Sequence, residues 1–305
     1  MDLGGTNVRA GLVKDGRIVR LLSEPCKADR PEGEVVDHIA SLIGKLITPD
    51  VARIGIGVPS VVDAARGIVY NVVGIPSWRE VYLKDLLEKR FGVPVYVNND
   101  CNCFALGVSR FGEASAYSDV VCVALGTGVG GGVVLGGKLL TGYTGAASEI
   151  GHMVIAENGE ECTCGSRGCF EAYSSATALI RDTKRTMAAH PESLLHAIAA
   201  EQGGVDGRTA FLAKERGDEA GAQVVEDYIE HLACGLTNLV NIFFPEVLAL
   251  SGGVANQGDA LLLPLRERVR ERSFGSRYAV SHTRIELCTL GYRAGVIGAA
   301  MLARE

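Results

Sequence analysis

Three cysteines and a glutamate lie close together in the segment CTCGSRGCFE, residues 162–171. Cys162, Cys164 and Cys169 stand beside Glu171, and such a cluster can form a disulfide, a redox centre or a metal site. A thioredoxin-like redox centre needs two residues between its cysteines, whereas one residue separates Cys162 from Cys164. The choice between the other two depends on the cellular compartment and on a fourth ligand.

The composition indicates a globular protein of the cytoplasm. Of the 305 residues, 47% are hydrophobic and 22% are charged, and this length suffices for two domains with separate cores. The net charge of −6, without a lysine/arginine block, argues against nucleic acid or a membrane surface as partner. No apolar run approaches the roughly 18 residues of a membrane span, and the N-terminal residues lack signal-peptide features. Because cytoplasmic thiols are kept reduced, the cluster is expected to bind a metal or to act in catalysis.

A closed tetrahedral zinc site needs a fourth ligand besides the three cysteines. His152, in SEIGHM, lies close enough in sequence for one compact loop. We therefore predict a structural Zn²⁺ site without an open position for catalysis, formed by His152, Cys162, Cys164 and Cys169. The alternative, thiols buried as small hydrophobic groups, is disfavoured by the polar residues between them. Glu149, Glu171 and the second ring nitrogen of His152 would then be fixed at a binding site.

Two glycine-rich stretches resemble each other, DLGGTNVRAGLVKDGRIV at 2–19 and ALGTGVGGGVVLGGKLL at 124–140. Each runs through a short polar loop and a β-branched strand to a turn at Asp15-Gly16 or Gly136-Gly137, dipeptides typical of type I′ hairpins. The repeat predicts a duplicated α/β domain.

The glycines of the second copy also fit G-x-G-x-x-G, but a strand and a turn follow where a dinucleotide-binding fold requires a helix. We therefore exclude that fold. The two loops, with Thr6 and Thr127 at similar places, are expected to hold phosphate oxygens on their backbone N–H groups. The alternative is that they are only tight hairpins.

The remaining pattern predicts further elements. Residues 222–247 have helical spacing broken by Pro245, 247–254 form a buried strand that leads into Gly252 and Gly253, and the last residues form a helix. Residues from about 174 to 220 are expected to be helical and polar. Asp100, in NND, stands where it would cap the helix that follows it.

Together the motifs DLGGTNVR, NNDCNCFALG, ALGTGVGGG, SEIGHM, CTCGSRGCFE and LSGGV resemble the ROK family of sugar kinases over essentially the whole chain. The resemblance implies an α/β fold of two duplicated actin-like (ribonuclease H-like) domains around a nucleotide and sugar cleft, with a zinc-binding loop. We expect a small domain of residues 1–112 with 291–305, and a large domain of residues 113–290.

The resemblance also implies roles for individual residues. Asp100 matches the catalytic base. The sugar ligands would be Asn71, Asn99, Asp100, Glu149, His152 and Glu171. The phosphates of MgATP would be held by Asp2, Gly4, Gly5, Thr6, Gly126, Thr127 and Gly128, while Gly252 and Gly253 would lie near the adenosine.

Three features depart from the family pattern. The family has a full buried strand before the first motif, whereas only Met1 precedes Asp2 here, so we expect the natural chain to start upstream. Ser60 replaces a common glycine beside the sugar loop, and Val108 replaces an acidic residue.

The resemblance implies an ATP-dependent kinase of carbohydrate metabolism and glycolysis that uses Mg²⁺ and forms a homodimer. We expect glucose as the substrate and glucose 6-phosphate as the product. The alternatives are phosphorylation of N-acetylglucosamine or N-acetylmannosamine, and a sugar sensor without catalysis. The acidic chain begins at its first phosphate loop, which disfavours a DNA-binding regulator.

Overall fold

The computed structural model describes residues 1–4, 7–72, 74–278 and 281–302. The strands are β1 (Asp2–Leu3), β2 (Asn7–Lys14), β3 (Arg17–Pro25), β4 (Ile54–Val58), β5 (Val61–Asp63), β6 (Ile68–Tyr70), β7 (Glu80–Val81), β8 (Val95–Asn99), β9 (Val120–Leu125), β10 (Val129–Leu135), β11 (Lys138–Leu139), β12 (Val247–Ser251) and β13 (Arg284–Leu287).

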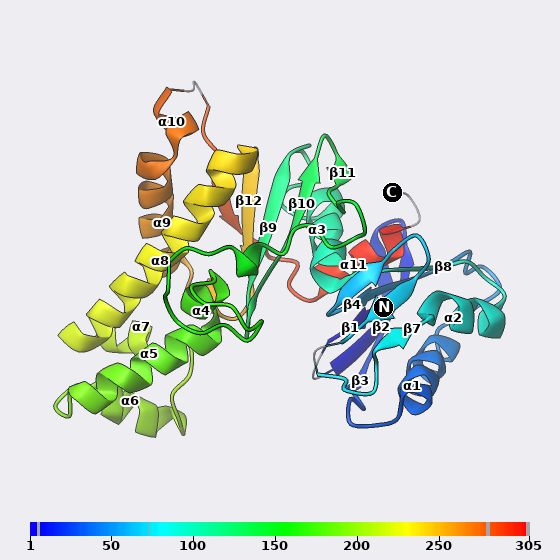
Figure 1. Ribbon diagram of the computed structural model, residues 1–305, viewed down its shortest axis with the longest axis horizontal. Helices are drawn as coiled ribbons and strands as arrows, with labels where there is room; N and C mark the ends of the chain where they lie inside the picture. The colour runs from blue at the N-terminus through cyan, green and yellow to red at the C-terminus, as the bar shows by residue number, and fades with distance from the viewer. Residues whose placement is uncertain (5–6, 73, 279–280, 303–305) are drawn as a thin grey trace. The chain divides into compact units, whose positions relative to one another are not determined.

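The helices are α1 (Glu32–Gly44), α2 (Leu83–Phe91), α3 (Asp100–Phe111), α4 (Glu171–Ser174), α5 (Ala176–Ala189), α6 (Leu195–Gln202), α7 (Thr209–Glu215), α8 (Glu219–Phe243), α9 (Asp259–Arg272), α10 (Phe274–Tyr278) and α11 (Arg293–Met301). Two short 3₁₀ turns are η1 (Ile150–His152) and η2 (Val254–Gln257). Figure 1 shows the course of the chain.

Two five-stranded sheets have the same topology, as the internal repeat predicts. Their strand orders are β3-β2-β1-β4-β8 and β11-β10-β9-β12-β13. In each sheet a hairpin forms one edge, and strands from later in the chain form the other. A smaller sheet has the order β5-β6-β7. The predicted duplication is thus present in the topology.

Both predicted hairpin turns are confirmed. Asp15 and Gly16 have φ values of 49° and 74°, and Gly136 and Gly137 have φ values of 55° and 74°. A type I′ turn requires positive φ at both central residues, and Gly adopts it at little cost. These turns fix the register of β2 with β3 and of β10 with β11.

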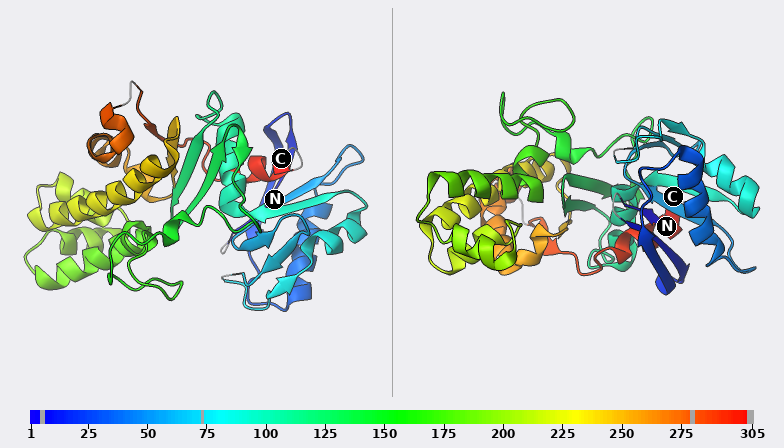
Figure 2. Two further views of the ribbon diagram at one scale, coloured as in Figure 1. Left: turned by 45° about the horizontal axis from the view of Figure 1, so that its top comes forward. Right: turned by 90° about the horizontal axis from the view of Figure 1, so that it is seen from below.

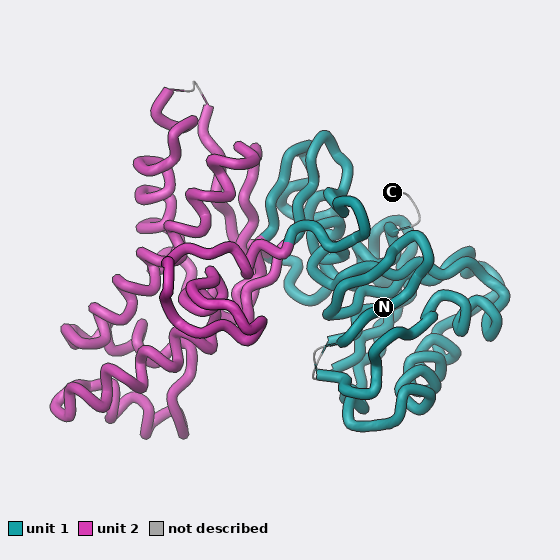
Figure 3. Tube along the Cα trace, in the orientation of Figure 1, with its two compact units in different colours: residues 1–122, 132–148, 289–305 teal, residues 123–131, 149–288 magenta. Residues whose placement is uncertain are grey.

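The chain divides into two compact units (Figure 3). Unit 1 comprises residues 1–122, 132–148 and 289–305, and unit 2 comprises residues 123–131 and 149–288. The domain boundaries expected from the sequence, 1–112 with 291–305 and 113–290, stay a prediction.

In unit 1, alternation along β4 gives its sheet two different faces. Ile54, Ile56 and Val58 join the core formed with α1 and α2. Gly55 and Gly57 point to the other face, where a Cβ on Gly55 would lie 1.7 Å from the backbone oxygen of Ala299 in α11. Alternate residues of a strand face opposite sides, so the glycines allow α11 and α3 to pack directly on the strand.

Helices α3 and α11 also approach each other closely. A Cβ on Gly298 would lie 1.7 Å from the backbone oxygen of Cys103, and one on Gly107 would lie 2.0 Å from that of Ala294. Small residues at a helix crossing allow this backbone contact. The crossing holds the N-terminal end of α3, where Asp100 lies, against the sheet.

Strand β1 is short but central in its sheet. It pairs antiparallel with β2 and parallel with β4, and the Met1 ammonium group donates to Gly55 O at 2.6 Å. Next to Met1, a cavity of about 640 Å³ is lined by Ala10–Lys14 of β2 and by Arg53–Gly55.

Helices α4–α9 belong to unit 2, and α8 with α9 run beside the β12 strand in all three views (Figures 1 and 2). The predicted helix at 222–247 corresponds to α8, which ends before Pro245, and the predicted strand corresponds to β12. The polar segment from 174 to 220 forms α5, α6 and α7, as predicted.

None of the helices in the described ranges has the length and apolarity needed to span a bilayer.

Candidate active site and metal centre

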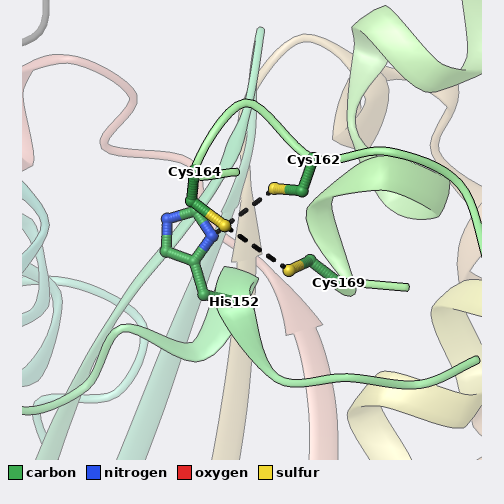
Figure 4. A group of neighbouring side chains, drawn as sticks. All are labelled: His152, Cys162, Cys164 and Cys169. Carbon is green, nitrogen blue, oxygen red and sulfur yellow. Dashed lines mark hydrogen bonds between the residues drawn. The ribbon is translucent and has the colours of Figure 1, made fainter. Parts of the chain in front are cut away.

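The four predicted metal ligands lie together in unit 2 (Figure 4). Their ligand atoms are all within 4.8 Å of one another. The Sγ of Cys162 lies 3.7 Å from Nδ1 of His152, and the Sγ of Cys164 lies 3.7 Å from that of Cys169. Residues from three places in the chain therefore form one compact donor set.

The spacing of these atoms fits a tetrahedral zinc ion. Zn–S bonds of about 2.3 Å and Zn–N bonds of about 2.0 Å place the ligand atoms of a tetrahedron roughly 3.5 to 3.8 Å apart. Burial, followed by the neighbouring thiols, raises the pKa of Cys169 to about 12. A divalent cation would reverse this effect because it stabilises the thiolate. The donor set is therefore suited to a metal ion that would stabilise its thiolates.

Glycines shape the loop that carries the cysteines. Gly165 and Gly168 have φ values of 87° and 78°, and a Cβ on Gly168 would lie 1.8 Å from the backbone oxygen of Ala156. The N–H of Gly165 donates to Cys162 O at 3.0 Å, which closes the turn between the cysteines. Positive φ and close approach both require glycine. The Gly-x-x-Gly spacing thus belongs to the fold of the metal loop.

Glu171 connects the metal loop to strand β10. Its Oε2 accepts the backbone N–H of Val129 at 2.9 Å, and its Oε1 accepts the hydroxyl of Thr163 at 3.1 Å. The same Oε1 lies 3.8 Å from the Sγ of Cys162. The carboxylate is therefore held between the metal loop and the residue that follows the second glycine loop.

Glu149 and His152 lie on either side of the η1 turn, in which the N–H of His152 donates to Glu149 O at 3.1 Å. This turn packs closely on β10, since a Cβ on Gly151 would lie 1.9 Å from the oxygen of Val129. Three predicted sugar ligands of unit 2 thus lie on segments that contact Val129.

The two predicted nucleotide loops of unit 2 are neighbours. Within the first, the N–H of Gly126 donates to Gly128 O at 3.0 Å. Gly252 has a φ of 96°, and its Cβ position would lie 2.2 Å from the oxygen of Leu125, directly before that loop. Gly253 follows at the start of η2. Side chains at Gly252 would push the two loops apart.

In unit 1, the cap of α3 differs from the prediction. The helix begins at Asp100, and its N-cap is Asn99, whose Oδ1 accepts the N–H groups of Cys101 and Asn102 at 2.8 and 3.2 Å. The prediction that Asp100 caps the helix was wrong by one residue, because Asn99 is an equally good cap. Asp100 accepts only the N–H of Cys101, at 2.8 Å, among the bonds described for its side chain.

The environment of Asp100 suits a proton acceptor. Burial and then the negative charge of Asp2 raise the pKa of Asp100 to about 6. Burial also raises the pKa of Asp2, while the N-terminal ammonium group and Arg9, 3.6 Å away, act in the opposite direction. A carboxylate with a pKa near 6 is ionised at neutral pH and can still hold a proton transiently.

A hydrogen-bond chain links the other predicted sugar ligands of unit 1. Asn99 Nδ2 donates to Ser60 O at 3.2 Å, and the Ser60 hydroxyl donates to Tyr70 O. The next residue, Asn71, has a φ of 45°, and its N–H donates to Arg79 O at 3.0 Å. Positive φ is uncommon outside glycine and is tolerated best by Asn and Asp. Ser60, which departs from the family pattern, thus joins the loop of Asn71 to Asn99.

The first phosphate loop is described only in part. The N–H of Gly4 donates to Asn7 O at 2.9 Å, and Asp2 lies in β1 directly before this turn. Gly5 and Thr6 lie outside the described residues.

Two residues that contact the site were not predicted from the sequence. Arg9 pairs with Asp2 and stacks on Tyr292, with 5.0 Å from its guanidinium carbon to the ring centroid. The hydroxyl of Thr177 donates to Thr127 O at 2.7 Å. The alternation along β2 could have placed Arg9 beside Asp2, but no local pattern marks Thr177.

Comparison with known proteins gives the family. The model of the ROK family matches residues 1–305, so the chain belongs to that family. A glucokinase of Thermotoga maritima is 36% identical over 100% of this chain and 96% of its own length.

Two solved structures resemble the whole chain. A ROK family glucokinase from Streptomyces griseus, in complex with glucose and AMPPNP, has 35% identity and a TM-score of 0.83 over 99% of this chain and 97% of that one. The ROK hexokinase of Thermus thermophilus has 31% identity and a TM-score of 0.82, over 99% and 95% of the two chains. The predicted actin-like fold class is thereby confirmed.

Proposed function

We propose that this protein is an ATP-dependent hexose kinase that converts glucose to glucose 6-phosphate. The main support for this proposal is the environment of Asp100. This half-buried carboxylate lies at the start of α3, and its pKa is raised to about 6. It occurs in a chain that matches, over 99% of its length, a glucokinase whose structure holds glucose and AMPPNP.

The reaction moves one phosphoryl group. The 6-hydroxyl oxygen of glucose forms a bond to the γ-phosphorus of ATP, and the bond to the β–γ bridging oxygen breaks and releases ADP. The hydroxyl proton passes to Asp100, which must be ionised to accept it. Mg²⁺ bound to ATP neutralises negative charge on the phosphates. Most of the remaining acceleration comes from the positions of the reactants.

The sugar is held by directional polar groups. We propose that Asn99 and Asn71 of unit 1, which Ser60 links through its bonds with Asn99 and with Tyr70 O, bind sugar hydroxyls. We propose the same role for Glu149, His152 and Glu171 of unit 2. The N–H groups of the Gly126–Gly128 loop and of the loop after Asp2 (Gly4, Gly5 and Thr6) would bind phosphate oxygens, with Gly252 and Gly253 beside the adenosine.

We propose that the metal is zinc and that its role is structural. Supporting this are the four donor atoms within 4.8 Å of one another and the preference of zinc for a Cys₃His set. The ion holds the loop in place, and this loop presents His152 and Glu171. Four protein ligands leave no position for a substrate.

Release of ADP from MgATP in the presence of different sugars tests the function. Glucose, N-acetylglucosamine, N-acetylmannosamine, mannose and fructose are compared at equal concentration. We expect the highest kcat/KM with glucose. A higher value with an N-acetylated hexose would correct the substrate, and sugar binding without ADP release for any sugar would identify a sensor.

We further propose that the kinase is a cytoplasmic homodimer that acts in glycolysis. Phe274 and Tyr278 are 70% and 76% exposed, and their tilted rings lie with 5.1 Å between centroids. Aromatic residues are enriched at protein interfaces. Light scattering after gel filtration should give twice the chain mass for the wild type. Replacement of both residues with serine should lower it, whereas Tyr143→Ser, at a tyrosine that is more exposed than either, should not.

A further inference from the structure

The segment that follows the metal ligands holds the second glycine loop at three points. Glu171 Oε2 accepts the N–H of Val129 at 2.9 Å. The N–H of Ala176 donates to Gly126 O at 2.8 Å, and the hydroxyl of Thr177 donates to Thr127 O at 2.7 Å. We call residues 171–177 the clamp segment. It forms hydrogen bonds with Gly126, Thr127 and Val129. Its Glu171 also approaches Gly128 so closely that a Cβ there would lie 2.2 Å from Oε2.

The loop needs such external support because of its composition. Glycine has the largest backbone freedom of all residues, and the loop contains Gly126 and Gly128 with one internal bond, from Gly126 N–H to Gly128 O at 3.0 Å. Ordering such a loop only when nucleotide binds would reduce the affinity, since the conformational entropy would be lost at that moment.

The bonds from the clamp segment also orient the peptide groups. In a trans peptide the carbonyl oxygen and the following N–H point in opposite directions. With the oxygen of Thr127 fixed toward Thr177, the N–H of Gly128 points away from helix α5. With the oxygen of Gly126 fixed toward Ala176, the N–H of Thr127 does the same. Both donors are then presented on one side of the loop, where an anion can accept from them.

The clamp segment is itself held firmly. The buried hydroxyl of Tyr228, in α8, donates to Ser174 O at 2.6 Å. Ser175 caps α5 through a bond from the N–H of Ala178 at 3.1 Å. Arg181 donates to Ala172 O at 2.9 Å. Contacts from two helices thus hold the residues that reach the loop.

We propose that Thr177 is a positioning residue for the nucleotide phosphates, acting through Thr127, and that the clamp segment makes the metal loop and the nucleotide loop one structural element. This inference rests on the proposed kinase function. It assigns Thr177, through its bond to Thr127 O, a role in nucleotide affinity and not in sugar affinity.

The test compares Thr177→Val with Thr177→Ser and with Thr186→Val. Valine keeps the shape of threonine and removes the hydroxyl, and serine keeps the hydroxyl. Thr186 lies further along the same helix α5, so its replacement controls for the effect of valine in that helix. Isothermal titration measures the Kd of MgADP and, separately, of glucose for each protein, and thermal unfolding measures Tm.

Loss of one hydrogen bond of about 1 kcal/mol corresponds to roughly a fivefold change in affinity. We expect Thr177→Val to bind MgADP about fivefold more weakly and to bind glucose as the wild type does, with Thr177→Ser near the wild type. An unchanged Kd for MgADP in Thr177→Val, or equal weakening of both ligands, would overturn the inference and leave the kinase function intact. A wild-type protein that binds no MgADP would instead overturn the proposed function.

Discussion

The side-chain oxygen of Asn99 accepts the backbone N–H of Cys101 at 2.8 Å, so that Asn99 caps helix α3 and Asp100 becomes its first residue. These two adjacent residues therefore have different positions and different expected roles at the start of the helix. Asn99 satisfies free N–H groups of the helix end, whereas Asp100, which accepts the N–H of Cys101 at 2.8 Å, is the residue that we propose as the base.

Replacement of Asn99 tests its role as the helix cap separately from its proposed role in sugar binding. We expect Asn99→Ala to lower the free energy of unfolding by about 1 kcal/mol, because the cap is lost. Asn99→Ser keeps a capping oxygen and should recover that stability, but it should not recover glucose affinity if the amide also binds the sugar. Chemical denaturation and glucose titration of both variants provide the two measurements. Equal stability of Asn99→Ala and the wild type would contradict the assigned cap.

The raised pKa of Asp100 predicts a pH dependence. Because the base must be ionised, kcat/KM should fall about tenfold for each pH unit below about 6, the pKa given by burial and the charge of Asp2. Rates measured between pH 4.5 and 8.5 at saturating Mg²⁺ show whether kcat/KM decreases in this way. The residual activity of Asp100→Asn should lack this decrease, and a flat wild-type profile between pH 5 and 7 would show that Asp100 is not the base.

The raised pKa of Asp100 also predicts how the free energy of unfolding changes with pH. Below the ordinary value of 3.8, Asp100 is protonated in the folded and the unfolded chain. Between that pH and about 6 only the unfolded chain loses the proton. The contribution of Asp100 to the free energy of unfolding therefore decreases as the pH rises through this range.

Removal of one thiolate tests the metal site. Cys164 is exposed, so Cys164→Ser removes a ligand with little loss of packing. We expect about one zinc ion per chain in the wild type, much less in Cys164→Ser, and a free energy of unfolding lower by at least about 2 kcal/mol. Cys234→Ser, at a half-buried cysteine outside the cluster, should retain the metal. Elemental analysis after dialysis that finds equal zinc in both variants would refute the ligand set.

The close approach of α3 and α11 predicts that a larger residue at their contact lowers the free energy of unfolding. The methyl group of Gly298→Ala would collide with the oxygen of Cys103 at 1.7 Å, which should cost about 2 to 4 kcal/mol. Gly33→Ala, in helix α1, meets nothing within 4 Å and should stabilise the protein by about 0.5 kcal/mol. Urea denaturation of the two variants measures the difference. A loss of less than 1 kcal/mol in Gly298→Ala would mean that the helices can separate at no great cost.

Local chemistry made part of the structure predictable from the sequence. The dipeptide Asp15-Gly16 defines its own turn, because few residues adopt positive φ. His152 and the three cysteines could be predicted to form one metal-binding cluster, because their types and spacing are typical of a thiolate-rich metal site. The repeated glycine hairpin likewise indicated the equal strand orders of the two sheets.

The contacts that the sequence did not reveal join residues far apart in the chain. Thr177 reaches Thr127 across 50 positions, and Glu171 reaches Val129 across 42. No periodicity encodes such pairs, which depend on how α4 and the first turn of α5 lie against the loop that leads into β10. The cap at Asn99 was missed for a different reason. Two neighbouring residues with equal capping preference leave the helix start undetermined by local rules.

The central claim is that Asp100 takes the proton of the sugar, and Asp100→Asn tests it most directly. ADP release from MgATP with glucose is measured beside the Kd of glucose for both proteins. For Asp100→Asn we expect a kcat about 10² to 10⁴ times lower, with glucose affinity within about threefold of the wild type. A kcat within tenfold of the wild type, with glucose still bound, would contradict it.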